Sequence, residues 1–350
     1  MATIILTGGG TAGHCVPHLA LLPYIKKDFD KIYYIGSSFG IEKNIIENAN
    51  IPYFSIECAK LERNFTLKNL TIPFKVLKGI ITAGELLDKL KPNVIFSKGG
   101  YVSLPTVIAA KKRKIPVISH ESDYTVGLAN KITAKYCKKV LTSFPETAKQ
   151  IKNGEYIGSP IRENLFRTSQ ENAKKFFGFT SNKPVLLVTG GSQGAQAINK
   201  CVREGLEELL TKFDVLHICG KGNVDKTLNF KGYKQIEYTN NIENAFSACS
   251  ICVSRAGSNT IFELLSLKIP CLLIPLPKNA SRGDQILNAK YFYKKGLVSV
   301  LFQDMMCKDS LVNEINATYA NRFNLKKNLE KTPVKDASRQ ISRIIADYMR

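Results

Sequence analysis

The sequence lacks any run of about 18 consecutive apolar residues, the length that a helix needs to cross a bilayer. Its N-terminus carries only a short apolar stretch at residues 4–6 before glycines begin, so we expect no signal peptide. Both absences argue against a membrane-spanning protein. We therefore expect the protein to remain on the cytosolic side of the membrane.

The sequence also lacks a recognisable metal-binding cluster. Its nine cysteines are odd in number and lie mostly in apolar segments, as expected for buried thiols in a reducing compartment. The one CxxC pair, Cys249 and Cys252, has no second pair or histidine cluster beside it. We interpret the acidic pair Asp28 and Asp30 as surface charge. We expect no metal and no other cofactor.

Acidic residues are scarce relative to basic ones, with 29 Asp and Glu against 50 Lys and Arg and a net charge of +21. This excess is divided almost evenly between residues 1–158 and 159–350, which argues against a basic tail for nucleic acid. A basic field of this kind attracts other polyanions. We expect diphosphates and anionic membrane surfaces as partners, and no nucleic acid.

The first glycine loop follows a short apolar strand at residues 3–7 and precedes a helix near residues 19–25. Gly8, Gly10 and Gly13 have the GxGxxG spacing of a dinucleotide-binding loop, which raises the possibility of an NAD dehydrogenase. However, the next strand, residues 31–35, ends in Gly-Ser-Ser without the acid that would hold a ribose. The spacing is therefore better evidence for a backbone that something approaches closely.

A second copy of this unit appears at residues 188–196, where Val-Thr-Gly-Gly echoes Leu-Thr-Gly-Gly at residues 6–9. The Gly- and Pro-containing stretch 155–160 has the character of a linker. With 350 residues and 44% hydrophobic content, the chain is long enough for two globular domains. We predict an α/β protein of two Rossmann-like domains, residues 1–158 and 159–333, whose parallel sheets face a central cleft.

Residues 253–288 are interpreted as a nucleotide-sugar pocket. A strand at 250–253, a helix at 259–268 and a strand at 270–275 precede a polar loop, so strand ends and a helix start converge. A helix N-terminus rich in small residues favours a phosphate, and Glu263, which falls off the apolar face of the helix, could accept sugar hydroxyls. The alternative is an ordinary α/β crossover with a polar rim.

A second site is expected in the first half, where strands end at residues 98–101 and 120–123, with Asn130 shortly after. Nearby, residues 64–87 mix apolar side chains with Lys68, Lys75 and Lys78. This pattern fits an interfacial contact with a membrane. It fits equally well a core helix whose lysine stems extend to solvent.

Seven ordered motifs resemble those of the MurG family, the glycosyltransferases that add N-acetylglucosamine to undecaprenyl-diphosphoryl-N-acetylmuramoyl pentapeptide in peptidoglycan synthesis. They are GGGTAGH at residues 8–14, SKGGYVS at 97–103, HESD at 120–123, GSPIR at 158–162, GGSQGA at 190–195, SRAGSNTIFE at 254–263 and DQILNA at 284–289. Two positions depart from the family pattern. Ala12 replaces a glycine, and Ser122-Asp123 replaces Gln-Asn at a position that the resemblance places near the acceptor.

The resemblance implies a GT-B fold and an inverting transfer from UDP-N-acetylglucosamine to the lipid-linked muramoyl pentapeptide at the cytoplasmic membrane face. It implies that Ser192 holds the diphosphate, Ile242 binds uracil, Glu263 binds the ribose and Gln285 binds the glucosamine ring. A final helix near residues 334–349 would pack on the first domain. The remaining substrate-binding positions are Thr11, Ala12, Gly13, Asn130, Arg162, Gln193, Ser258, Asn259, Thr260 and Asp284.

Inversion requires a base for the attacking hydroxyl group. His14, at the end of the first glycine loop, is the first candidate, because a neutral imidazole is available near pH 7. A hydrogen-bonded helix cap is its structural alternative. Glu121 is the second candidate, whereas His18 and His217 are interpreted as structural.

Two other functions remain open from the sequence. Another lipid-acceptor glycosyltransferase of similar fold, such as a diacylglycerol galactosyltransferase, would share the nucleotide-sugar pocket. A catalytically silent nucleotide-sugar-binding protein would share it too, but His14, Glu121, Glu263 and Gln285 argue against the silent protein.

Overall fold

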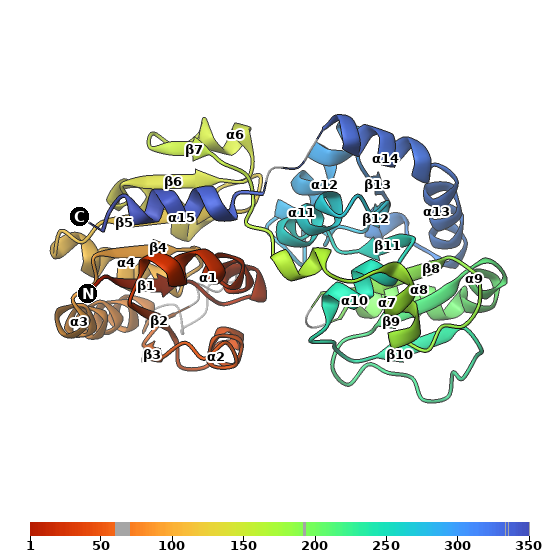
Figure 1. Ribbon diagram of the computed structural model, residues 1–350, viewed down its shortest axis with the longest axis horizontal. Coiled ribbons are helices and arrows are strands. Elements are labelled where there is room, and N and C mark those ends of the chain that lie inside the picture. The colour runs from red at the N-terminus through yellow and green to blue at the C-terminus, as the bar shows by residue number, and fades with distance from the viewer. Residues whose placement is uncertain (60–70, 192–193, 333, 335, 350) are drawn as a thin grey trace. The chain divides into compact units, whose positions relative to one another are not determined.

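The computed structural model describes residues 1–59, 71–191, 194–332, 334 and 336–349. These residues form two compact units (Figure 1). Unit 1 contains residues 1–162 together with the C-terminal segment from residue 335, and unit 2 contains residues 163–334. The division after Arg162 lies close to the expected linker at residues 155–160.

Unit 1 is built on a seven-stranded parallel sheet with the order β3-β2-β1-β4-β5-β6-β7. The central strand β1 is buried along its whole length, which is consistent with the apolar residues at its centre, Ile4-Ile5-Leu6. The strands are β1 (Thr3–Thr7), β2 (Lys31–Ser37), β3 (Tyr53–Ile56), β4 (Val94–Ser97), β5 (Val117–Glu121), β6 (Lys139–Thr142) and β7 (Gly154–Tyr156).

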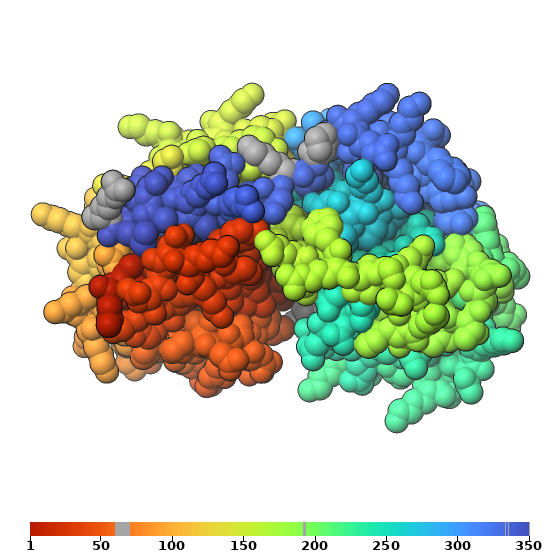
Figure 2. Space-filling view, viewed as in Figure 1, coloured from red at the N-terminus to blue at the C-terminus, as the bar shows by residue number. Residues whose placement is uncertain are grey.

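Helices cover both faces of this sheet. The C-terminal helix α15 (Ser338–Ala346) returns to pack on α1 (Val16–Asp28), as Figures 1 and 2 show. Ile341 and Ile345 are fully buried in the cluster that contains Leu21 and Ile25. Each such side chain stabilises the unit by about 1.5–3 kcal/mol. The other helices are α2 (Ile41–Glu47), α3 (Ile72–Leu90), α4 (Ser103–Lys112), α5 (Leu128–Thr133) and α6 (Pro145–Ala148).

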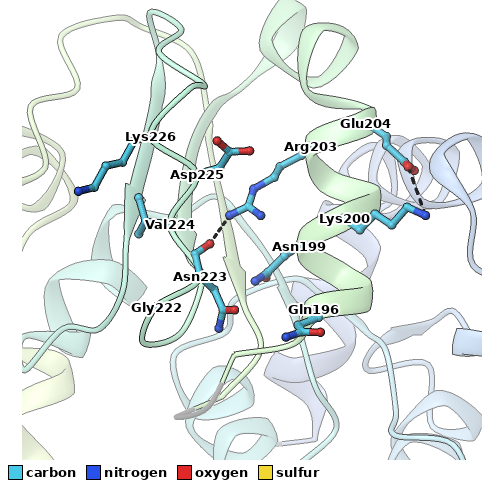
Figure 3. Close-up of a pocket in the computed structure, with 10 residues that line it drawn as sticks. All are labelled: Gln196, Asn199, Lys200, Arg203, Glu204, Gly222, Asn223, Val224, Asp225 and Lys226. Atoms are coloured by element: carbon cyan, nitrogen blue, oxygen red, sulfur yellow. Dashed lines mark hydrogen bonds and ion pairs between the residues drawn. The ribbon is translucent and has the colours of Figure 1, made fainter.

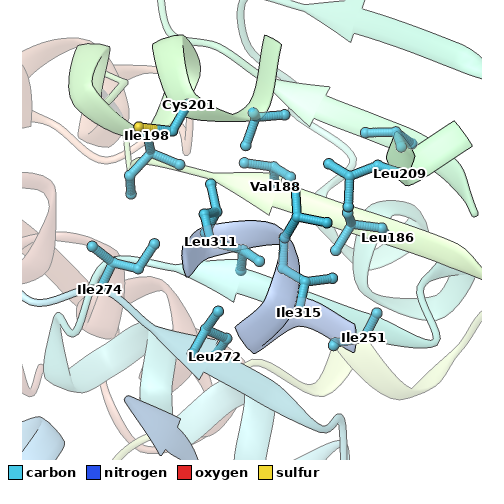
Figure 4. Close-up of a cluster of buried hydrophobic side chains, with 14 of the residues drawn as sticks. Leu186, Val188, Ile198, Cys201, Leu209, Ile251, Leu272, Ile274, Leu311 and Ile315 are labelled. Atoms are coloured by element: carbon cyan, nitrogen blue, oxygen red, sulfur yellow. The ribbon is translucent and has the colours of Figure 1, made fainter. Parts of the chain in front are cut away.

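Unit 2 is built on a six-stranded parallel sheet with the order β10-β9-β8-β11-β12-β13. Figure 4 shows its core, where Leu311 and Ile315 of α13 (Lys308–Ala320) pack on the apolar side chains of the central strands. The strands are β8 (Val185–Thr189), β9 (Asp214–Ile218), β10 (Tyr233–Ile236), β11 (Ile251–Ser254), β12 (Cys271–Leu273) and β13 (Ser299–Val300).

The helices of unit 2 alternate with its strands in the Rossmann manner. Two of them begin directly after central strands, α8 (Gln196–Glu204) after β8 and α11 (Ser258–Ser266) after β11. The others are α7 (Gln170–Phe176), α9 (Leu206–Lys212), α10 (Ile242–Ala248), α12 (Asp284–Lys294) and α14 (Arg322–Lys331). The prediction of two Rossmann-like domains with parallel sheets is therefore confirmed.

Each sheet has a point at which the strand order reverses. In unit 1 the chain proceeds from β1 to β2 and β3 on one side, then returns to β4 beside β1 and continues on the other side. In unit 2 the same reversal lies between β8 and β11. Loops that leave two such strands diverge, and the crevice at their carboxyl ends is where open α/β sheets bind ligands.

Within the described residues, no helix combines the length and apolarity needed to span a membrane.

Candidate functional site

The first glycine loop lies at the reversal point of unit 1, directly after β1. Gly10 has a φ of 87°, a backbone angle that residues other than glycine rarely adopt. Its N–H donates to Oε2 of Glu42 at 3.2 Å, and a Cβ at Gly10 would lie 2.5 Å from the Tyr101 ring. The groups that closely approach this backbone are therefore side chains of unit 1 itself.

His14 ends the short helix η1 (Ala12–His14) that follows the glycines. Its Nδ1 lies 3.0 Å from Oγ1 of Thr11. On the other side, a Cβ at Gly100 would lie 2.3 Å from the Gly9 carbonyl oxygen and 3.3 Å from this Nδ1. The loops after β1 and β4 thus pack together, and the half-buried His14 ring lies where they meet.

Glu121 and Asn130 form a buried pair at the end of β5, each 4% exposed. The Glu121 carboxylate accepts hydrogen bonds from the N–H groups of Asp123 and Gly127 and from Nδ2 of Asn130 at 2.9 Å. Burial raises the pKa of Glu121, and the charge of Asp123 raises it further. With three donors on a buried carboxylate, this geometry favours positioning of Asn130 over proton transfer by Glu121.

Asn130 faces Gly99 in the turn after β4, because a Cβ at Gly99 would lie 2.5 Å from its Oδ1. In the described part of the chain this Oδ1 has no hydrogen-bond partner although it is buried. Thr11, Ala12, Gly13 and His14 thus follow β1, and Asn130 lies on α5 after β5, at the same edge of the sheet.

Lys98, a residue that the sequence reasoning did not single out, is almost completely buried behind these loops. Its Nζ lies 2.6 Å from Nδ1 of His120 and donates to Oγ of Ser122 at 2.6 Å. Burial lowers the pKa of Lys98 to about 7 and holds the pKa of His120 well below its usual value. Ser122, one of the two family departures, is thus turned inward toward Lys98.

In unit 2 the second glycine loop follows β8 at the reversal point. Gly191 has a φ of 86°, and an added Cβ there would meet no atom within 4 Å. A Cβ added at Gly257, the N-cap of α11 after the neighbouring strand β11, would also meet no atom within 4 Å. Gly191 and the N-cap of α11 therefore present open backbone, whereas an added Cβ would lie 2.3 Å from Ala195 N at Gly190 and 2.0 Å from the Cys219 carbonyl oxygen at Gly194. Ser192 and Gln193 lie outside the described residues.

Glu263 lies about one and a half turns from the start of α11, and the structure corrects one expectation about it. The residue was expected to fall off the buried face, but it is only 8% exposed. The preceding residue, Phe262, contacts Phe292 of α12 in a T-shaped arrangement with 5.4 Å between ring centroids. Ile261, Leu264 and Leu265 point to the core as predicted.

The polar loop after β12 is held close to these residues by side-chain hydrogen bonds. Oε1 of Gln285 accepts from the N–H of Leu276 at 3.0 Å, and Asn288 donates to the Ala256 carbonyl oxygen at 3.3 Å. Asp284 begins α12 and lies beside Arg282, with 3.6 Å between Oδ1 and Nε. The structure thus brings Asp284 and Gln285 to the same sheet edge as Ser258, Asn259, Thr260 and Glu263.

Two predicted residues lie elsewhere in the fold. Ile242 begins α10, after the edge strand β10 and two strands away from β8. Arg162 is the last residue of unit 1 rather than part of unit 2.

A separate pocket of about 560 Å³ lies on the outer flank of α8 (Figure 3). Arg203 crosses it and donates to the Asn223 carbonyl oxygen and to Gln235, which ties the loop at residues 220–226 to the helix. Lys200 pairs with Glu204 at 3.8 Å. None of the predicted site residues that the structure describes lines this pocket, and two of its cationic groups, Arg203 and Lys200, are engaged with neighbouring groups.

His18 and His217 are fully buried. Burial lowers the pKa of each to about 3, so both imidazoles are neutral at physiological pH. His217 bonds to Tyr233 and Asn199, consistent with the expected structural role. In the part of the chain that the structure describes, no group of three His, Cys, Asp or Glu side chains is placed to hold a metal ion.

Comparisons with known proteins match both units. Residues 4–142 match the glycosyltransferase family 28 N-terminal domain, and residues 185–341 match the C-terminal domain of the same family. A relative from Clostridium tetani, "UDP-N-acetylglucosamine-N-acetylmuramyl-(pentapeptide) pyrophosphoryl-undecaprenol N-acetylglucosamine transferase", is 50% identical and aligns over 99% of this chain and 98% of its own. A Clostridium botulinum protein of the same name is 48% identical, with 99% of each chain covered.

Two solved structures share the fold. MurG of Acinetobacter baumannii is 23% identical with a TM-score of 0.75 over 99% of this chain and 100% of that chain. The UDP-GlcNAc 2-epimerase of Neisseria meningitidis, bound to UDP-GlcNAc, is 14% identical with a TM-score of 0.66 over 100% and 99% of the two chains. At these identities the likeness concerns the fold alone.

Proposed function

The chain belongs to the MurG family of glycosyltransferases, and on this premise we propose that unit 2 binds the donor while unit 1 activates the acceptor. The protein transfers N-acetylglucosamine from UDP-N-acetylglucosamine to N-acetylmuramyl-(pentapeptide) pyrophosphoryl-undecaprenol. This step converts lipid I to lipid II in peptidoglycan synthesis.

The observation that carries the donor assignment is the open backbone of unit 2. Gly191, in the loop that precedes α8, and Gly257, the N-cap of α11, leave space near two helix N-termini, which present N–H groups and positive dipole ends. A diphosphate placed there would lie beside Glu263, which we assign to the ribose hydroxyls, and Gln285, which we assign to the glucosamine ring. We assign Ile242 to the uracil, Arg162 to the phosphate side and the loop of Ser192 and Gln193 to the diphosphate.

In the proposed mechanism His14 removes the proton of the muramoyl hydroxyl group. The freed oxygen forms a bond to the anomeric carbon while the bond from that carbon to the UDP oxygen breaks, which inverts the configuration. The leaving diphosphate gains negative charge in the transition state. Backbone N–H groups at the two helix starts stabilise this charge, and one donor of this kind contributes about 2.7–4 kcal/mol to the barrier reduction.

The first prediction follows from the donor assignment. Because amides and helix dipoles replace a metal in this scheme, UDP should bind with unchanged affinity after treatment with EDTA, as measured by isothermal titration calorimetry. A Kd that rises more than tenfold on chelation, and returns with Mg²⁺, contradicts the scheme.

The acceptor is tested in a transfer assay. Radiolabelled N-acetylglucosamine should be incorporated into lipid-linked muramoyl pentapeptide and not into diacylglycerol. The reverse preference would support a diacylglycerol glycosyltransferase, and hydrolysis or transfer of neither kind would support a silent nucleotide-sugar-binding protein.

We also propose that α3 rests on the anionic cytoplasmic surface of the membrane, which makes the protein peripheral. Phe74, Leu77 and Ile81 share one helix face and are 76%, 55% and 56% exposed. Lys75 and Lys78 are exposed beside them. Of the two interpretations of residues 64–87, these positions favour the interfacial contact over a core helix, because the apolar face lies outside the core. Residues 64–70 lie outside the described residues.

Membrane binding is predicted to depend on this face. The double substitution Phe74→Ser and Leu77→Ser should lower binding to vesicles that contain phosphatidylglycerol by roughly tenfold or more, since it removes most of the exposed apolar area. Sedimentation with vesicles measures this, and Phe323→Ser, at a residue of unit 2 that is 67% exposed, is the matched control. Equal loss in both variants would remove α3 from this role.

A further inference from the structure

Glu42 is a fully buried carboxylate that the proposed mechanism does not use. It extends from the first turn of α2 to the first glycine loop. Its Oε2 accepts the N–H of Gly10 at 3.2 Å, and its Oε1 accepts the N–H of Ser37 at 3.3 Å and the hydroxyl group of Ser37. Two amides and a hydroxyl are the kind of donor set with which glycine loops hold the oxygens of a phosphate.

The position of this carboxylate matters because Gly10 is the second glycine of the GxGxxG spacing. In dinucleotide-binding loops that glycine allows the backbone to approach the pyrophosphate. Here a Cβ at Gly9 would lie 2.6 Å from Cδ of Glu42, and a Cβ at Gly40 would lie 2.0 Å from its Oε1. The space beside the loop is therefore filled by the carboxylate, and Gly9 and Gly40 accommodate it.

The second glycine loop differs at this point. Gly191 has open space where Gly9 faces Glu42, and so does Gly257 at the start of α11. Among the described residues, no carboxylate side chain hydrogen-bonds to the N–H groups of Gly190, Gly191, Gly194 or Ala195. The two similar glycine loops thus differ at corresponding glycines, because Glu42 fills the space beside Gly9 and the space beside Gly191 is open.

We propose that Glu42 occupies the phosphate position of the first glycine loop, that it keeps phosphate groups away from the Gly10 amide and that it fixes the loop which carries His14. A carboxylate already bound to the loop repels a second anion and removes the Gly10 amide as a donor. The donor nucleotide is thereby directed to unit 2. The loop of unit 1 is left to present His14 to a hydroxyl group, and this catalytic part of the proposal rests on the role proposed for His14.

The phosphate part is tested without catalysis, by titrating inorganic pyrophosphate into the deuterated, ¹⁵N-labelled full chain and following the amide signals of Gly10 and Gly191. In the wild type the Gly191 signal should move and the Gly10 signal should not. In Glu42→Ala the Gly10 signal should also move, because the position is vacated. Glu47→Ala, at an exposed position on the same helix, is the control and should behave as the wild type.

A wild-type Gly10 signal that moves with the same affinity as that of Gly191 overturns the proposal, and this reading needs no variant. If Glu42→Ala folds and its Gly10 signal does not move when pyrophosphate is added, the proposal is overturned as well. If the Glu42→Ala protein does not fold, Glu42→Gln gives a second reading through catalysis. It keeps the size of the side chain but places an amide donor or a neutral oxygen against Gly10.

For Glu42→Gln we expect kcat to fall by roughly 10–100-fold with the KM for UDP-N-acetylglucosamine unchanged, because a displaced loop misplaces His14. A merely structural role would instead lower the fraction of folded enzyme and leave the kcat of that folded fraction unchanged, so active sites are counted in each sample. An unchanged kcat in folded Glu42→Gln overturns the positioning role. Failure of the proposed function would look different, because the wild type would then transfer no sugar whatever the Gly10 signal does.

Discussion

His14→Ala should lower kcat by roughly 10²–10⁴ while the affinity for UDP-N-acetylglucosamine barely changes. The size of the effect follows from the loss of general-base catalysis, since water would have to accept the proton of the muramoyl hydroxyl group. Donor affinity should be retained because the proposed donor residues belong to unit 2, whereas His14 belongs to unit 1. Steady-state kinetics with both substrates varied, together with UDP titration, measures the two quantities.

The matched control for this experiment is His14→Asn. Asparagine can still bond to the Thr11 hydroxyl group, which lies 3.0 Å from Nδ1 in the native protein, but it cannot act as a base near pH 7. Both variants should therefore be equally slow if His14 transfers the proton. Recovery of activity in His14→Asn would mean that the ring only caps and orders the loop, which is the structural alternative for this residue.

The pH dependence of kcat distinguishes the two candidates for the general base, the His14 imidazole and the Glu121 carboxylate. Burial raises the pKa of Glu121 above its ordinary value, yet its three hydrogen-bond donors are arranged around the charged form. Glu121→Gln should thus act mainly by releasing Asn130 and the loop up to Gly127. A lower free energy of unfolding with a kcat close to that of the wild type would match this positioning role. An acid limb of the kcat profile that disappears in Glu121→Gln would instead identify Glu121 as the base.

The two Rossmann-like units could be predicted from the sequence because a parallel α/β fold leaves a strong local record. Buried strands such as Thr3–Thr7 and Val185–Thr189 are continuous apolar runs, and each is followed at once by glycines and a helix. The repetition of that order in both halves of the chain sets the class of fold. The predicted helix at residues 259–268 corresponds to α11 at Ser258–Ser266 for the same reason.

The parts that sequence did not predict depend on contacts between distant segments. Glu42 bonds to a loop 32 residues away, and Lys98, after β4, bonds to His120 and Ser122 at the end of the adjacent strand β5. Neither contact can be recognised from a local sequence pattern. One signal was available for Glu42, since the missing acid at the end of the second strand left the purpose of the GxGxxG spacing unexplained. The burial of Glu263 was missed because the apolar periodicity of this segment marks one buried face, and Glu263 lies outside that face.

Glu263→Ala should weaken UDP binding by roughly 10–100-fold without unfolding unit 2. A hydrogen bond to a charged group contributes about 1.5–3 kcal/mol, which corresponds to this range for one ribose hydroxyl group. The side chain lies near the start of α11, where the backbone of Gly257 is open, so a ribose can be reached from the same edge as the diphosphate. Calorimetric titration with UDP measures the loss, with Glu208→Ala on the exposed side of α9 as the control.

A second ligand makes this test specific for the ribose. In the wild type, 2′-deoxy-UDP should bind more weakly than UDP, because it lacks a hydroxyl group that the Glu263 carboxylate accepts. In Glu263→Ala the two ligands should bind alike, since the acceptor is then gone and the losses from the two changes do not add. If the two losses instead add fully, Glu263 and the 2′-hydroxyl group do not interact, and the ribose position belongs elsewhere on unit 2. An unchanged UDP affinity in Glu263→Ala would contradict the assignment of Glu263 to the ribose, because α11 would then not contribute this side chain to donor binding.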